Sequence, residues 1–153
     1  MLGRHYEGQN CSIARTLEIV GERWTMLIIR DALLGRHRFD EFRTSLGIAR
    51  NILTDRLNRL VDNGILERIR YQDVPPRFDY QLTDRGRELA TPILALMHWG
   101  DRHVAGRAGP PRLVRHAMCG GEVTERHACA HCGPINGAEL TIEPGPGLLP
   151  TMD

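Results

Sequence analysis

The stretch from residue 39 to residue 82 constrains the fold more than any other part of the chain. It begins with a helical pattern over residues 39–46, where apolar side chains recur every three or four positions: Phe39, Phe42 and Leu46. Gly47 follows, at the point where a tight turn needs a residue that readily takes positive φ. A second helical pattern covers residues 49–63 and ends at Gly64. Two short helices joined by a glycine turn predict a helix-turn-helix.

After this pair of helices the hydrophobic pattern changes from helical to alternating. Residues 65–70 alternate with period two, and residues 78–82 form a matching run across a tip, 73–77, that contains two prolines. This pattern predicts a two-stranded hairpin, or wing. The expected fold class is therefore mainly α with a small β wing, a winged helix-turn-helix, and such a fragment is suited to contact DNA.

Seven arginine, asparagine and threonine residues are the predicted DNA contacts. The second helix presents its first turns to the major groove, where arginine can bond guanine and asparagine can bond adenine with two hydrogen bonds each. Other arginines fit phosphates, and those on the wing fit the minor groove. The alternative is a solvated surface on which Asp55 and Arg59 form pairs within the helix. The predicted base-reading residues are Arg50, Asn51 and Thr54, the phosphate contacts are Arg38 and Arg56, and the wing contacts are Arg70 and Arg77.

Helical patterns also flank the winged segment. One is expected from Ser12, as N-cap, to residue 20, and a largely apolar one from Glu22 to about Leu34. After the wing, a helix is expected at residues 84–104 behind Thr83 as N-cap, with an apolar stripe along one face from Leu89 onward. We expect this last helix, with the N-terminal helix, to form a homodimer, the alternative being that it packs on its own core. The expected organisation is a domain at 1–104, a Gly/Pro linker at 105–112 and an extension at 113–153.

The extension contains three of the four cysteines in the chain, with several histidines. His116, Cys119, Cys129 and Cys132 form an HxxC…CxxC pattern, which suits one tetrahedral structural Zn²⁺. His127 or His131 could replace His116 as the fourth ligand. Alternatively, Cys129 and Cys132 are a redox pair, or the cluster holds no metal. A short strand is expected at residues 139–142.

Composition and motifs indicate where the protein resides in the cell and whether it is an enzyme. The chain has no apolar run of about 18 residues and no signal-peptide core at its start, which predicts a cytoplasmic protein without a membrane span. The sequence shows no nucleophile paired with a general base and no phosphate-binding loop, so an enzyme is not expected. The remaining alternative to a DNA-binding regulator is a protein- or RNA-interaction module built on a winged helix with a zinc knuckle.

Many short elements in the same order resemble those of the HxlR-type winged-helix transcriptional regulators, relatives of the MarR regulators. The match covers about residues 11–101 and includes Cys11, GERWT at 21–25, RFDEF at 38–42, LTDRLNRL at 53–60, Pro75-Pro76 and Trp99-Gly100. The resemblance implies a homodimeric DNA-binding regulator, commonly a repressor of nearby genes. An oxidant or a small molecule is the expected effector. Ala49 departs from the family, which often has a serine cap there.

Cys11 lies just before the first helix. Helix N–H groups and the helix dipole favour the reactive thiolate at such a position, and Arg15 is one turn away. The residues alone favour a small side chain buried at the dimer seam, whereas the resemblance implies a sensing role for Cys11.

Overall fold

The computed structural model describes residues 6–147, and the chain divides into two compact units, Met1–Ile93 and Leu94–Asp153. The division falls inside a helix rather than at the expected linker 105–112. Each unit is described separately below.

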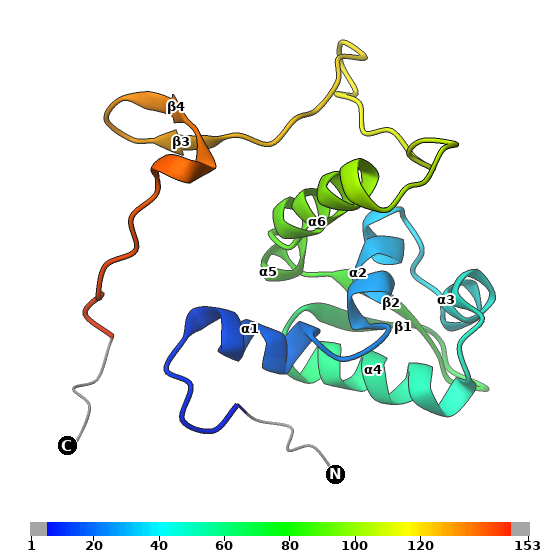
Figure 1. Ribbon diagram of the computed structural model, residues 1–153. Helices are drawn as coiled ribbons and strands as arrows, with labels where there is room; N and C mark the ends of the chain where they lie inside the picture. The colour runs from blue at the N-terminus through cyan, green and yellow to red at the C-terminus, as the bar shows by residue number, and fades with distance from the viewer. Residues whose placement is uncertain (1–5, 148–153) are drawn as a thin grey trace. The chain divides into compact units, whose positions relative to one another are not determined.

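The first unit contains the winged helix-turn-helix. Its helices are α1 (Ser12–Val20), α2 (Thr25–Leu33), α3 (Phe39–Leu46) and α4 (Arg50–Asp62). The α3–turn–α4 prediction is confirmed: Gly47 ends α3 at φ 61°, and Gly64 follows α4 at φ 66°, a left-handed conformation that glycine adopts without strain. Figure 1 shows α2, α3 and α4 grouped beside a β hairpin.

The hairpin consists of β1 (Leu66–Gln72) and β2 (Arg77–Leu82), paired antiparallel in a register that puts Leu66 opposite Leu82. The residues before α3 add a short third edge, which the sequence did not reveal: Arg38 forms a β bridge with Asp79, and the Tyr80 amide donates to the His37 carbonyl at 2.7 Å. This edge fixes the start of α3 against the wing.

The core of the first unit lies where α2, α3, α4 and the start of the wing meet. Its large side chains are fully buried, and each contributes about 1.5–3 kcal/mol to folding by leaving water. They are Ile28, Ile29, Phe42, Leu53, Leu57, Leu60 and Leu66. The helical and alternating apolar patterns of the sequence therefore face one common core.

Three predicted helix boundaries are wrong. Cys11, not Ser12, is the N-cap residue of α1. The second helix begins at Thr25 instead of Glu22, because Trp24 takes a left-handed conformation with φ 79°.

The third error concerns the helix expected at 84–104, which is two helices: α5 (Asp84–Arg87) and α6 (Ala90–His103). Thr83 caps α5 as predicted, its Oγ1 accepting from the Gly86 amide at 3.0 Å. Pro92 lies in the first turn of α6, where its missing N–H removes no helical hydrogen bond.

The second unit contains most of α6, a small hairpin of β3 (His127–Cys129) and β4 (Gly133–Ile135), and the 3₁₀ turn η1 (Gly137–Glu139). The strand expected at 139–142 is absent from the described residues: η1 ends at Glu139, and residues 140–142 pair with no strand. No residue between Leu94 and residue 147 is buried. None of the helices within residues 6–147 combines the length and the apolar composition that crossing a membrane requires.

Candidate nucleic-acid interface

The outward face of α4 is a polar stripe. Leu53, Leu57 and Leu60 hold the opposite face of the helix in the core, so residues offset by one position point to solvent. The stripe consists of Arg50, Asn51, Thr54, Asp55, Asn58 and Asp62. Asn58 was not among the predicted contacts, although its position four residues after Thr54 would have indicated it.

The three predicted base-reading residues are all exposed. The Arg50 guanidinium lies 5.1 Å from the centroid of the Phe39 ring and 4.0 Å from the Asp40 carboxylate, and its side chain is 67% exposed. Thr54 Oγ1 donates to the Arg50 carbonyl at 2.9 Å, which leaves its oxygen as an acceptor. Asn51 hydrogen-bonds to none of the described side chains through its amide, so both its donor and its acceptor remain available.

Arg56 has partners that the sequence did not predict. Its Nη2 donates to Glu22 Oε2 at 2.8 Å, its Nε donates to the Arg23 carbonyl at 3.2 Å, and only 14% of its side chain is exposed. Arg59 donates to the other oxygen of the same carboxylate at 2.9 Å. These bonds tie α4 to the α1–α2 turn, a role different from the phosphate contact predicted for Arg56. Asp55 pairs with the adjacent Arg56 and not with Arg59, the residue named with it in the solvated-surface alternative.

The basic residues of the wing differ in how far they are neutralised. Arg70 contacts the Asp73 carboxylate at 3.1 Å and the Asp73 carbonyl at 2.9 Å. Arg38 lies 3.6 Å from the Asp79 carboxylate and 5.0 Å from the centroid of the Tyr71 ring. Arg77 is exposed and forms no ion pair with any described residue. The wing therefore presents Arg77 as an unneutralised cation, with Arg38 and Arg70 held in place beside it.

Cys11 is exposed at the N-terminus of α1. The backbone N–H of Ala14, and to a lesser extent that of Ile13, lowers the pKa of this thiol by hydrogen-bonding to the thiolate. A lowered pKa increases the fraction of thiolate at neutral pH, and the thiolate is the form that reacts with oxidants. Within a single chain the Cys11 thiol is accessible to solvent.

The four predicted metal ligands lie in two pairs. His116 Nδ1 is 3.1 Å from Cys119 Sγ, and the His131 amide donates to Cys129 Sγ at 3.4 Å. Hydrogen bonds from the backbone N–H of Cys132, from that of His131 and from the Cys132 thiol lower the pKa of Cys129. Within residues 6–147, no three His, Cys, Asp or Glu side chains are close enough to hold one ion.

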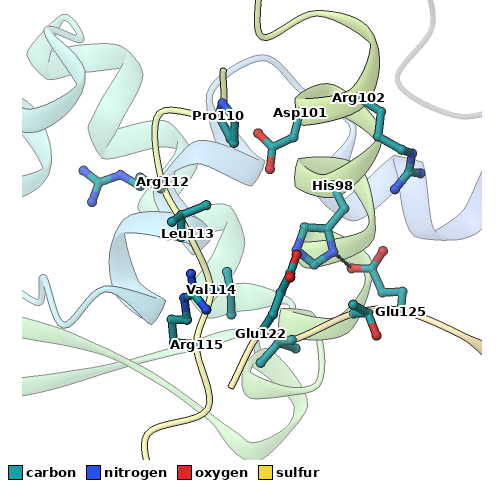
Figure 2. A pocket seen from close by; sticks show the side chains of 12 residues that line it. His98, Asp101, Arg102, Pro110, Arg112, Leu113, Val114, Arg115, Glu122 and Glu125 are labelled. Carbon is teal, nitrogen blue, oxygen red and sulfur yellow. Dashed lines mark ion pairs between the residues drawn. The ribbon is translucent and has the colours of Figure 1, made fainter. Parts of the chain in front are cut away.

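A cavity of about 490 Å³ lies in the second unit, between α6 and residues 110–125. Figure 2 shows His98 directed into it, and His98 Nδ1 is 2.9 Å from Glu125 Oε1. Leu113, Val114 and Val123 supply apolar wall. The size is within the range of small-molecule sites, about 300–1,000 Å³.

The family model for HxlR-like helix-turn-helix proteins matches residues 19–107, more than half of the chain. The chain belongs to the HxlR-like helix-turn-helix family. The predicted resemblance and the class of transcriptional regulator are therefore confirmed.

Similarity extends beyond the residues of the family model. An uncharacterised HTH-type transcriptional regulator from Mycobacterium tuberculosis is 44% identical over 148 residues, which are 96% of this chain and 92% of the relative. A solved transcription-factor candidate from Pseudomonas aeruginosa, PA1374, is 40% identical, with a TM-score of 0.66 over 93% of this chain and 97% of its own. The redox regulator HypR, solved in its reduced form, is 33% identical with a TM-score of 0.57, over 60% of this chain and 92% of its own.

Proposed function

We propose that this HxlR-family protein is a cytoplasmic, sequence-specific DNA-binding repressor that acts as a homodimer and catalyses no reaction. Its extension is a zinc-ribbon-like appendage outside the DNA-reading unit. The observation that carries the proposal is the exposed polar stripe of α4, which a buried leucine face orients outward beside a basic wing. This arrangement matches the way helix-turn-helix proteins enter the major groove.

In this proposal different exposed residues contact the bases and the phosphates of DNA. Arg50 and Asn51, in the first turn of α4, bond base edges, because their side chains can form two hydrogen bonds to guanine and to adenine. Arg38 and Arg77 contact phosphates, and Arg70 supports the tip of the wing. Phosphate contacts position the protein, and base contacts supply the sequence preference.

Exposed apolar residues support the homodimer. On α1, Ile13 is 70% exposed and Leu17 is 41% exposed; on α6, Leu96 is 59% exposed and Trp99 is 54% exposed. Covering large apolar side chains in such positions with a second surface removes them from water and lowers the free energy of the assembly. Two copies of α4 would then read half-sites about 34 Å apart on one face of the duplex.

We propose an oxidant as the signal and Cys11 as the thiol that receives it. The exposed position of Cys11 and its lowered pKa support this role. The structural similarity to HypR, a redox regulator solved in reduced and oxidised forms, points in the same direction. The cavity beside α6 would be the place for a small-molecule effector if oxidation has no effect.

The test is binding to duplex DNA from upstream of the protein's own gene, measured by fluorescence anisotropy from 50 to 200 mM salt. We expect the logarithm of the affinity to fall linearly with the logarithm of salt, since each neutralised phosphate contributes a slope of about −0.9. Oxidation should weaken binding, and Cys11→Ser should remove that effect. Binding equal to that of unrelated duplex would contradict sequence-specific recognition, and tighter binding to RNA would favour the interaction-module alternative.

A further inference from the structure

The two Cys/His pairs of the extension are loops of the same design. Each loop places two potential ligands three residues apart and follows the second with a glycine of positive φ, 69° at Gly120 and 84° at Gly133. Each loop also closes a short antiparallel pairing: residues 115 and 122 bridge across the first, and Cys129 pairs with Gly133 in the second. A helical family fold does not require two such loops.

Within each loop the ligand atoms already converge. The 3.1 Å between His116 Nδ1 and Cys119 Sγ is close to the roughly 3.5 Å that tetrahedral zinc bonds of 2.0–2.1 Å to nitrogen and about 2.3 Å to sulfur would impose. In the second loop the His131 amide donates to Cys129 Sγ at 3.4 Å, and Cys132 lies in the turn that joins Cys129 to its strand partner Gly133. Each loop is therefore half of a tetrahedral ligand set.

Few other interactions stabilise residues 105–147. No residue from 105 to 147 is buried, and its regular structure consists of two three-residue strands and one 3₁₀ turn. Segments shorter than about 40 residues rarely fold by burial alone and usually need a disulfide, a metal or a partner. The four cysteines are free thiols.

We propose that His116, Cys119, Cys129 and Cys132 bind one Zn²⁺ and that the ion joins the two loops into one folded unit. Binding would replace three thiol protons, which are released to solvent, by three zinc–sulfur bonds, with neutral His116 as the fourth ligand. The site rests on the zinc-ribbon-like nature proposed for the extension and is independent of DNA recognition. Four protein ligands leave no open coordination position, so the zinc is structural.

The equivalence of the loops selects His116 over the other two histidines. His116 occupies in the first loop the position that Cys129 occupies in the second, three residues before a Cys-Gly pair. His131 lies between Cys129 and Cys132, and its backbone already donates to one of these sulfurs. His127 lies before the second loop, on β3. Nine residues separate Cys119 from Cys129, enough to let the two loops face each other.

The zinc would also shape the cavity beside α6. Glu122 follows the first loop and Glu125 precedes the second, and both line the cavity, where Glu125 contacts His98 on α6 (Figure 2). A closed zinc site would hold the segment from 116 to 132 in one conformation. The metal would thereby fix one wall of the cavity.

The test is elemental analysis of the full chain, purified under reducing conditions with zinc supplied, together with Co²⁺ substitution. We expect one zinc per chain and a cobalt spectrum with the sulfur-to-metal charge-transfer band of three thiolates. Cys119→Ser, Cys129→Ser, Cys132→Ser and His116→Ala should each weaken zinc binding by more than about 100-fold, beyond the 10–100-fold effect of losing a supporting residue. His127→Ala and His131→Ala are the matched controls and should retain the metal.

A second measurement tests the zinc site without replacing a ligand, in case the ligand variants do not fold. In a Cys11→Ser background, a mercurial thiol reagent should release one zinc as it modifies the three remaining thiols. Metal-free protein with no cobalt spectrum would overturn the proposal, as would full zinc retention in Cys129→Ser or half a zinc per chain. Loss of zinc in His127→Ala or His131→Ala but not in His116→Ala would overturn the ligand assignment. DNA affinity should persist in Cys129→Ser, so failure of DNA binding and failure of metal binding are separate results.

Discussion

Two exposed residues of the proposed interface, Asn51 and Arg77, have different chemistry available to them. The Asn51 amide lies in the first turn of α4 and offers both a donor and an acceptor, the pair that matches the major-groove edge of adenine. Arg77 begins β2 and offers a charge that no described residue neutralises. Asn51 can therefore discriminate between bases, whereas Arg77 contributes affinity without preference.

We predict that Asn51→Ala loses discrimination at one base pair of the operator, by about 1–3 kcal/mol, with its salt dependence unchanged. Arg77→Ala should instead weaken all sequences alike and reduce the salt slope by about one unit. The measurement is anisotropy with the operator, its single-base variants and unrelated duplex. A change of sequence preference in Arg77→Ala would refute its phosphate role.

The pH dependence of Cys11 reactivity follows from its lowered pKa. Only the thiolate is alkylated, so the rate rises as pH rises through the pKa, and a lowered pKa moves that rise to lower pH. We predict that Cys11 reacts with iodoacetamide at a lower pH than the same residue in an unfolded peptide of the sequence 6–16. Peptide mass spectrometry measures the rate site by site, and coincident profiles would show that the helix N-terminus does not activate the thiol.

At the residue scale the sequence predicted positions on α4 better than it predicted partners. The leucine spacing correctly indicated which face is buried and therefore that Arg50, Asn51 and Thr54 are exposed. It could not reveal that Arg56 pairs with Glu22, 34 positions earlier, because helical periodicity carries no information about which distant element covers a half-buried position. The same holds for the Arg38–Asp79 bridge.

At the scale of elements, Glu22 joins the α1–α2 turn to α4. One carboxylate accepts from Arg56 at 2.8 Å and from Arg59 at 2.9 Å, and Arg59 also donates to the Glu18 carbonyl at 3.2 Å. Charge-assisted bonds of this kind to partly buried arginines contribute about 1.5–3 kcal/mol each, before the cost of dehydrating the groups. The orientation of α4 thus depends on a contact far from its DNA-facing stripe.

We predict that Glu22→Gln lowers the free energy of unfolding by about 1–3 kcal/mol, since it leaves two arginines without a carboxylate. It should also weaken DNA binding, although Glu22 is not part of the DNA-facing stripe. Urea denaturation and anisotropy measure the two effects. Asp55→Asn is the matched control for stability, because among the described residues Asp55 forms an ion pair with the adjacent Arg56 and its side chain is half exposed. Equal stabilities for Glu22→Gln and Asp55→Asn would show that the contact does not fix α4.

Element boundaries were predictable where a local rule decides them. Gly47 and Gly64 end helices because each needs a left-handed conformation, and the sequence shows both. The break at Glu88 and Leu89, between α5 and α6, was not predicted, although the apolar stripe begins only at Leu89 and Pro92 fits the first turn of a helix. The predicted strand at 139–142 failed because its composition suited a strand but no partner strand lies beside it.

At the scale of the whole molecule, one chain leaves two helices with many apolar side chains uncovered. No residue of α6 is buried, and α1 buries only Val20. A chain that reads one half-site gains affinity when a second copy is held at the correct spacing, because the second binding event becomes intramolecular. The same dimer would therefore bury these helices and place two copies of α4 on a two-fold operator.

We predict that Leu96→Glu converts the dimer to a monomer and lowers operator affinity at least tenfold, while the fold of the first unit persists. Burying a carboxylate in a desolvated apolar interface costs several kcal/mol of binding free energy, more than the loss of one apolar contact would cost. The dimer should therefore dissociate rather than accommodate the charge. Ile142→Glu is the matched control: Ile142 is 98% exposed and lies outside every helix and strand, so both mass and affinity should be unchanged. Light scattering after size-exclusion chromatography gives the mass, and far-UV circular dichroism confirms helix content. A dimeric Leu96→Glu variant with full affinity would place the dimer contact away from this face of α6, and a wild-type monomer that still binds the operator tightly would remove the dimer from the mechanism.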